Sequence, residues 1–300
     1  MISRIVPYQN YIKRGQSFHG SAPLSKQVVD TSYKAINENS ADYIKKCYSI
    51  CKNLCHVATE VNVETERLTN IVKSNEPHIF IMNHTTNAMN DIRSAEFFNT
   101  LLYREYIYKG KAETCPRSKV LANRNILNSQ EDNGEMFKWM GVTPISAHVT
   151  GGNKEKNKSV ITKIVENLGS GRINLFLFPE GAFCMFPFLP MQYKFQPGVS
   201  SIVKKVLELR DSIKVVPLGF AHNRKLSAIH IGESICFSKN KGVYQASKAS
   251  QVINLTENGQ PVDYNHVVPY ISGVLLNNLK EAKKLAKEDL KHSKEKVYTL

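Results

Sequence analysis

The sequence lacks a long run of apolar residues: none approaches the length of about 18 residues that a membrane-spanning helix needs. The first thirty residues also lack the apolar core of a secretory signal, which argues against export. They carry Arg4, Lys13, Arg14 and Lys26, and no acid precedes Asp30. Such a composition is typical of a basic surface segment and also of an organellar transit peptide. We therefore expect a cytoplasmic protein, with organellar targeting as the open alternative.

Zinc-type cysteine spacing is absent as well, although the chain has six cysteines. Cys47, Cys51 and Cys55 recur every four residues, which places them on one face of a helix, and His56 follows. Three thiols spread along about 12 Å of helix do not converge on one tetrahedral ion without other ligands. We expect a buried stripe of reduced thiols and no metal site.

Motifs of several common chemistries are missing. The sequence has no G-x-S-x-G elbow, so a serine hydrolase is not favoured. It also has no Walker loop and no G-x-G-x-x-G fingerprint, which lowers the case for nucleotide-dependent chemistry.

Acidic residues are scarce relative to basic ones. Twenty-six Asp and Glu against 40 Lys and Arg give a net charge of +14, which attracts nucleic acid, anionic lipid surfaces or phosphorylated substrates. No nucleic-acid-binding module is visible and the aromatic residues are not interleaved with basic ones, so a nucleic acid partner is not favoured. The Lys-rich stretch 271–296 is either a solvated helix face or a membrane-surface contact.

The chain of 300 residues, 42% of them hydrophobic, is long enough to bury a sizeable core. We expect strands at 78–82, at 118–126, within 133–148, from 172 to Pro179-Glu180-Gly181, at 213–223 and at 226–237, and helices at 26–68, 91–106, 160–171, 198–209 and 271–296. This alternation predicts an α/β fold with a mixed, largely parallel central sheet flanked by helices. We expect a basic N-terminal segment with a helical extension (1–70), followed by an α/β domain with a Lys-rich C-terminal helix (71–300).

Polar residues follow two of the predicted strands. Asn83 and His84 come directly after 78–82, and Glu180 lies in the Pro-Glu-Gly turn that ends the later apolar strand. In parallel sheets the chemistry collects at the carboxyl ends of the strands, so both side chains are expected at one edge.

His84 has the chemistry of a general base. A neutral imidazole can remove a hydroxyl proton, and a carboxylate such as Asp91, seven residues later, can fix its tautomer and stabilise the imidazolium. The alternative is that Asn90 or Asp91 only caps the next helix. A histidine base without a nucleophile of its own suggests direct transfer, in which the substrate's hydroxyl attacks an activated carbonyl.

Segments of the chain resemble the sequence blocks of a known family. These are "IFIMNHTTNAMND" (79–91), "FKWMGVTPISAH" (137–148), "LFLFPEGAF" (175–183), "YKFQPGVSSI" (193–202) and "VVPLGF" (215–220). In order and spacing over residues 76–240, they resemble the glycerolipid acyltransferase family, which includes the lysophosphatidate and glycerol-3-phosphate acyltransferases.

The resemblance implies an O-acyltransferase of phospholipid biosynthesis or remodelling that works at a membrane surface. It would move a fatty acyl group from acyl-CoA or acyl-carrier protein to a hydroxyl of a glycerolipid or lysophospholipid, without a bound cofactor. His84 would be the base and Asp91 would orient it. The implied substrate contacts are Asn83, Phe178, Pro179, Glu180, Gly181, Arg124 and Lys194.

The chain departs from the family pattern at three positions. The family has the pattern H-x4-D. In this chain Met89 occupies the position of the aspartate, and the aspartate comes two residues later, at Asp91. Either two inserted residues restore the pair, or His84 has no carboxylate partner.

Two arginines that the family uses for the acceptor's phosphate are replaced by Phe183 and Ala147, which cannot form a bidentate fork. Other nearby cations that could take their place are Arg124, Lys154, Lys156, Arg172 and Lys194. The other interpretation is a larger or uncharged head group.

The apolar stretch that follows Gly181, "AFCMFPFLPM" (182–191), has three open interpretations: a buried loop and strand, a segment that enters a bilayer, or the lining of an acyl groove. Two alternatives to the predicted enzyme also stay open. One is a transacylase that takes its acyl group from a phospholipid, and the other is a non-catalytic lipid-binding relative.

Overall fold

The computed structural model describes residues 60–63, 65–84, 88–123, 142–145, 154–180, 195–222, 226–249 and 251–292. In chain order the elements are β1 (Glu60–Val63), α4 (Thr65–Ser74), β2 (His78–Met82), α5 (Ala88–Tyr108), η2 (Ala112–Thr114), β3 (Arg117–Asn123), β4 (Val142–Ile145), α8 (Lys154–Gly169), β5 (Ile173–Leu177), α9 (Gly198–Val206), β6 (Ser212–His222), β7 (Leu226–Ile231), β8 (Ile235–Asn240), β9 (Val243–Lys248), β10 (Gln251–Asn254), β11 (Thr256–Glu257), β12 (Gln260–Pro261) and α10 (Val267–His292).

Ten of the described strands form one sheet with the order β10-β9-β8-β6-β2-β5-β3-β4, to which β7 and β1 are added beside β6. The central strand β2 is parallel to both of its neighbours, β5 and β6. Strand β3 is parallel to β5 and β4, whereas β7, β8 and β9 pair in antiparallel fashion. The predicted α/β class with a mixed, largely parallel sheet is therefore confirmed.

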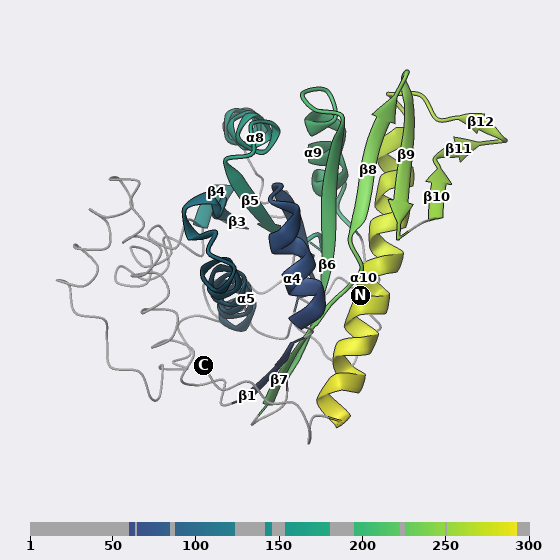
Figure 1. Ribbon diagram of the computed structural model, residues 1–300. Coiled ribbons are helices and arrows are strands. Elements are labelled where there is room, and N and C mark those ends of the chain that lie inside the picture. Colours follow the sequence, from purple (N-terminus) through teal and green to yellow (C-terminus); the bar gives the residue numbers. More distant parts are fainter. Residues whose placement is uncertain are drawn as a thin grey trace, which may run out of the picture.

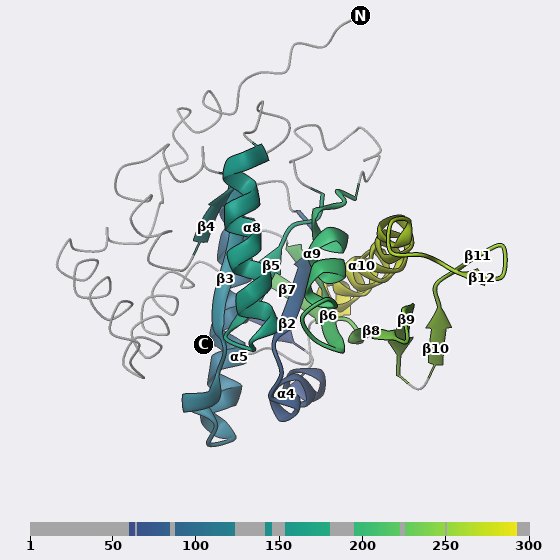
Figure 2. The ribbon, with the colours of Figure 1, turned by 90° about the horizontal axis from the view of Figure 1, so that it is seen from above.

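Helices cover both faces of this sheet, and each face has its own hydrophobic cluster. Successive residues of β2 alternate between them, because strand side chains point to opposite faces in turn. Phe80 and Met82 pack with α4 and α5, whereas Ile79 and Ile81 pack with α8, α9 and α10. In Figure 1, β3 and β5 lie between α8 above and α5 below, and Figure 2 shows α8, α9 and α10 on one side. None of the described helices is long and apolar enough to cross a lipid bilayer.

Two sequence-based predictions about secondary structure are wrong. Residues 60–63 were expected to be helical, but they form β1, which pairs in parallel with β7, a partner more than 160 residues away. Residues 226–237 form two strands rather than one. They break at Gly232, because β7 pairs with the outer half of β6 and β8 with its first half. The division of the chain at residue 70 stays a prediction, and Cys47, Cys51 and Cys55 lie outside the described residues.

Helix α10 packs on β6 more closely than side chains usually permit. Its buried stripe includes the predicted Leu275, Leu279, Ala282 and Ala286. A Cβ atom at Gly219 of β6 would overlap the backbone of Ala282 and would come within 2.7 Å of the next backbone nitrogen. The missing side chain therefore lets helix and strand backbones touch.

Replacing Gly219 by alanine is expected to destabilise the protein by about 2 kcal/mol or more, because the helix must move away from the sheet. Gly273 is the control. It lies in α10, the helix that Gly219 contacts, and a Cβ atom at Gly273 meets nothing within 4 Å. Gly273→Ala should raise stability by about 0.5–1 kcal/mol, because alanine is the better helix former. Urea unfolding checks both, and equal effects of the two variants would contradict the close contact.

Candidate active site at the carboxyl ends of β2 and β5

His84 and Glu180 lie at the same edge of the sheet, as the sequence predicted. The last paired residues of β2 and β5 are Ile81 and Leu177. His84 lies three positions beyond the first of these, and Glu180 lies three positions beyond the second. The two chain ends therefore leave the sheet side by side, at the edge where ligands bind in parallel α/β folds.

The His84 ring stacks on the ring of Phe178, with centroids 4.9 Å apart and planes inclined by 16°. Phe178 packs partly buried against the hydrophobic cluster beneath α4 and α5. His84 itself is half-buried. A flat contact of this kind limits the rotation of the imidazole ring.

The turn after β5 is anchored at its base. Glu180 is 8% exposed, and both of its carboxylate oxygens are shielded from solvent. The carbonyl oxygen of Pro179 accepts a hydrogen bond of 2.7 Å from the backbone N–H of Gln196, just before α9. Pro179 and Gln196 therefore lie side by side.

Asn83 is 2% exposed and hydrogen-bonds to the main chain with both ends of its side-chain amide. Its Oδ1 accepts from the N–H of Phe220 at 2.8 Å, and its Nδ2 donates to the carbonyl of the same residue at 3.1 Å. Nδ2 also lies 3.2 Å from the carbonyl oxygen of His84. Contact of Asn83 with a substrate stays a prediction.

Helix α5 begins four residues after His84 and carries Asp91 in its first turn. Position 91 precedes Ala95 by four residues and Phe98 by seven, and both of these are buried against the sheet. Since residues at these spacings share one helix face, position 91 continues the sheet-facing stripe and position 89 does not. The side chain of Asp91 lies outside the described residues, so its pairing with His84 stays a prediction.

Most of the remaining predicted site residues lie outside the part of the chain that the structure describes. Gly181, Arg124 and Lys194 lie outside the described residues, as do the side chains of Lys154 and Lys156. Arg172 directly precedes β5 and so lies at the opposite edge from His84; its proposed role as a nearby cation is wrong. Within the described part of the chain, no cluster of His, Cys, Asp and Glu side chains is suited to a metal ion.

His222 was missed as a site candidate. It ends β6, the strand next to β2, and its ring centroid lies 5.9 Å from that of Phe220. Val216, Leu218 and Phe220 share the cluster beneath α4 and α5, so the alternation places position 222 on the face that carries Phe178. The alternation of residues in the predicted strand 213–223 already placed position 222 on the same face as position 220.

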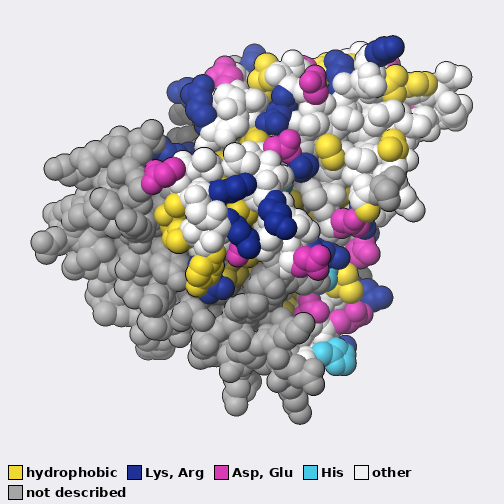
Figure 3. All heavy atoms as spheres, in the orientation of Figure 1, with side chains coloured by type: hydrophobic (Ala, Val, Ile, Leu, Met, Phe, Trp, Pro, Cys, Tyr) yellow, Lys and Arg dark blue, Asp and Glu magenta, His cyan; other side chains and the backbone are white. Residues whose placement is uncertain are grey.

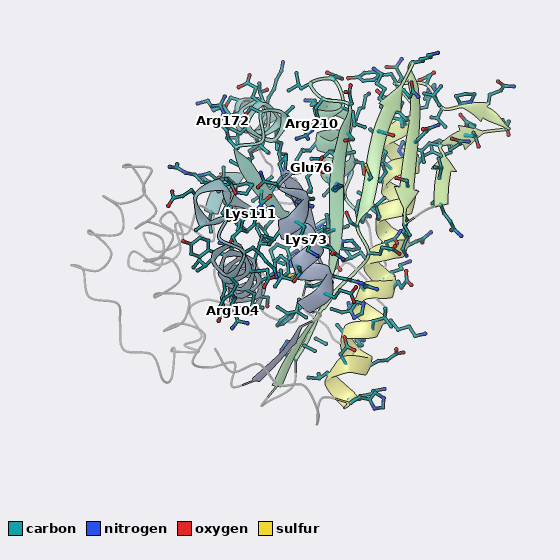
Figure 4. The ribbon with its side chains drawn as sticks, in the orientation of Figure 1. Lys73, Glu76, Arg104, Lys111, Arg172 and Arg210 are labelled. Carbon is teal, nitrogen blue, oxygen red and sulfur yellow. The ribbon has the colours of Figure 1, made fainter. Side chains whose placement is uncertain are left out.

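The opposite edge of the sheet has a different character. Glu76, Arg172 and Arg210, labelled in Figure 4, precede β2, β5 and β6. Lys214 forms an ion pair of 2.7 Å with Glu76, and this hydrogen bond is the main cause that lowers the pKa of the Glu76 carboxyl. On the face seen in Figure 3, Lys and Arg side chains are interspersed with Asp and Glu rather than gathered in one uniform field.

His78, at the start of β2, contrasts with His84 beyond its end. It is 1% exposed, and its Nδ1 has no hydrogen-bond partner among the residues that the structure describes. Burial, aided by the positive charge of Lys214, lowers the pKa of His78 from 6.5 to about 4. This histidine is therefore a neutral core residue, whereas His84 lies beyond the opposite end of the same strand.

The buried His78 predicts a loss of stability in mild acid. The unfolded chain binds a proton at His78 below about pH 6.5, whereas the folded chain does so only below about pH 4. Between pH 7 and pH 5 this group alone should cost about 2 kcal/mol of unfolding free energy. His78→Leu should remove this part of the pH dependence of the unfolding free energy. His266→Leu, which replaces an exposed histidine, should leave it in place. Urea titrations at both pH values check this, and an unchanged pH slope in His78→Leu would contradict it.

Comparison with known proteins adds one finding. No curated protein matches the chain with significance. The family model described as Acyltransferase matches residues 60–221, more than half of the chain, from β1 to the outer end of β6. This range contains β2, β5 and the turns that carry His84 and Glu180, so the chain belongs to the Acyltransferase family.

Proposed function

We propose that the protein is an O-acyltransferase that moves a fatty acyl group from an acyl thioester to a hydroxyl of a glycerolipid or lysophospholipid. The observation that carries the proposal is the half-buried His84, stacked on Phe178 at the carboxyl edge of an Acyltransferase-family sheet. The donor would be acyl-CoA or acyl-carrier protein, and the setting phospholipid biosynthesis or remodelling.

The proposed reaction needs one base and no covalent bond between the acyl group and the enzyme. A ring nitrogen of His84 takes the proton of the acceptor hydroxyl as the hydroxyl oxygen attacks the thioester carbonyl. The tetrahedral intermediate collapses, the carbon–sulfur bond breaks, and the departing thiolate receives the proton from the imidazolium. Proton transfer of this kind contributes about 10²- to 10⁴-fold to the rate. Holding the two substrates side by side contributes further.

Asp91 is the proposed partner of His84. A carboxylate on the other ring nitrogen would hold the reactive tautomer and stabilise the imidazolium. Its support is the backbone geometry, because position 91 lies in the first turn of α5 and in line with the buried Ala95 and Phe98. The spacing of six residues would then serve the role that four serve in the family pattern.

Glu180 is the proposed contact for the acceptor. Its carboxylate lies in the turn that follows β5, and a carboxylate accepts hydrogen bonds from hydroxyl groups such as those of the acceptor. Arg124, Lys194 and the main chain at Pro179 and Gly181 complete the proposed substrate contacts. Because Phe183 and Ala147 replace the expected arginines, we favour an acceptor with a larger or uncharged head group over one with a bare phosphate monoester.

We further propose that the protein works on the cytoplasmic side as a peripheral membrane protein. The net charge of +14 favours anionic lipid surfaces, and a lipid acceptor is presented at such a surface. Two other functions compete with this proposal: transfer from a phospholipid donor, and lipid binding without chemistry.

Thiol release by the wild-type protein distinguishes these functions. With acyl-CoA or acyl-carrier protein, we expect release to rise at least about tenfold when a suitable acceptor is added, since the hydroxyl is the nucleophile. The acceptor panel includes lysophospholipids with neutral and charged head groups, glycerol 3-phosphate and monoacylglycerol.

Labelled acyl phospholipid without any thioester is the parallel arm. Acyl transfer from the phospholipid alone would show the transacylase. Lipid binding without transfer from either donor would show the non-catalytic relative, and both results would contradict the proposal.

A further inference from the structure

The end of β2 is held by a side chain rather than by the sheet's own ladder. The last backbone pair between β2 and β6 joins Met82 to Leu218. One residue further, the amide of Asn83 takes over, with Oδ1 on the N–H of Phe220 and Nδ2 on its carbonyl. The amide therefore bonds both polar groups of one residue across the strands and extends the pairing toward His84.

Phe220, to which the amide of Asn83 bonds, is itself held in place by its neighbours. Phe220 lies within β6, and its neighbour in the sheet is Ile229 of β7. Directly before it, Gly219 touches the backbone of α10, so the strand cannot move toward the helix. Phe220 is thus bounded by a strand on one side, β2 on the other and a helix behind.

We propose that Asn83 is a positioning residue that fixes His84 against Phe178, and that it does not bind substrate. Its Oδ1 and Nδ2 contact the main chain of Phe220, and Nδ2 also lies 3.2 Å from the carbonyl of His84 itself. The side chain is 2% exposed, so little of it faces a substrate. The inference rests on the proposed role of His84 as the base, and it replaces the substrate contact expected from the sequence.

Asn174 offers a matched control within the same sheet. It lies in β5, is 1% exposed, and its Oδ1 accepts from the backbone N–H of His78 at 2.9 Å. It is therefore a second buried asparagine that holds β2, at the strand's other end. Loss of Asn174 tests what general loosening of β2 does to activity.

Three variants test the inference: Asn83→Ala, Asn83→Asp and Asn174→Ala. Aspartate can accept from the N–H of Phe220 but cannot donate to the carbonyls of Phe220 and His84. For both Asn83 variants we expect kcat to fall on the order of 10- to 100-fold, because a displaced base misses the reacting hydroxyl. KM for donor and acceptor should stay within about twofold of wild type, since no substrate contact is lost. Asn174→Ala should lower the unfolding midpoint and leave kcat near that of wild type.

A second measurement is independent of activity. The stack of His84 on Phe178 shifts the imidazole proton signals in NMR spectra through the ring current. Asn83→Ala should move these signals toward the values of an unstacked histidine, and Asn174→Ala should leave them in place. Spectra of His84→Ala identify the signals.

The outcomes separate the two proposals. A rise in KM with unchanged kcat in Asn83→Ala would show substrate binding and overturn the inference. Equal loss of kcat in Asn83→Ala and Asn174→Ala, or unmoved imidazole signals in Asn83→Ala, would reduce Asn83 to a general stabilising residue. If the wild type transfers no acyl group at all, the proposed function fails, and the NMR signals alone still decide whether Asn83 fixes His84.

Discussion

The parallel pairing of β2 between β5 and β6 is the constraint on which the rest of the structure depends. It brings Ile81 level with Leu177 on one side and Met82 level with Leu218 on the other. The ends of β2, β5 and β6, which carry His84, Glu180 and His222, therefore emerge at one edge although they lie far apart in the sequence. Without this register, His84 and the turn at Glu180 would not share a site, and the amide of Asn83 would have no backbone to bond.

The alternation of strand residues decides on which face of the sheet that site opens. On one face of β2, Phe80 and Met82 pack in the cluster beneath α4 and α5. Phe178, directly after β5, packs against the same cluster. His84 stacks on this last aromatic ring, where α5 begins. The opposite face is closed by α8, α9 and α10, and the close contact at Gly219 leaves no room there.

Much of this arrangement could be predicted from the sequence, because it depends on local patterns. The apolar runs of β2 and β5 are visible in the sequence, and a polar turn directly after each run identifies the active edge. The stripe of α10 is visible for the same reason, since its period is that of a helix.

What could not be predicted depends on partners that are distant in the sequence. Residues 60–63 become a strand only because β7 offers an edge to pair with. The break at Gly232 arises because two parts of β6 pair with different strands. Asn83 was expected to contact a substrate, and the bonds that occupy its amide come from Phe220, 137 residues further along the chain.

The central claim is that His84 removes the proton of the acceptor hydroxyl. The most direct measurement is single-turnover thiol release by His84→Ala, with and without added imidazole, against enzyme-free controls at the same imidazole concentration. A loss of about 10²-fold or more, partly restored by imidazole only when the variant is present, is the result expected for a missing base. Release by His84→Ala at the wild-type rate would contradict the claim.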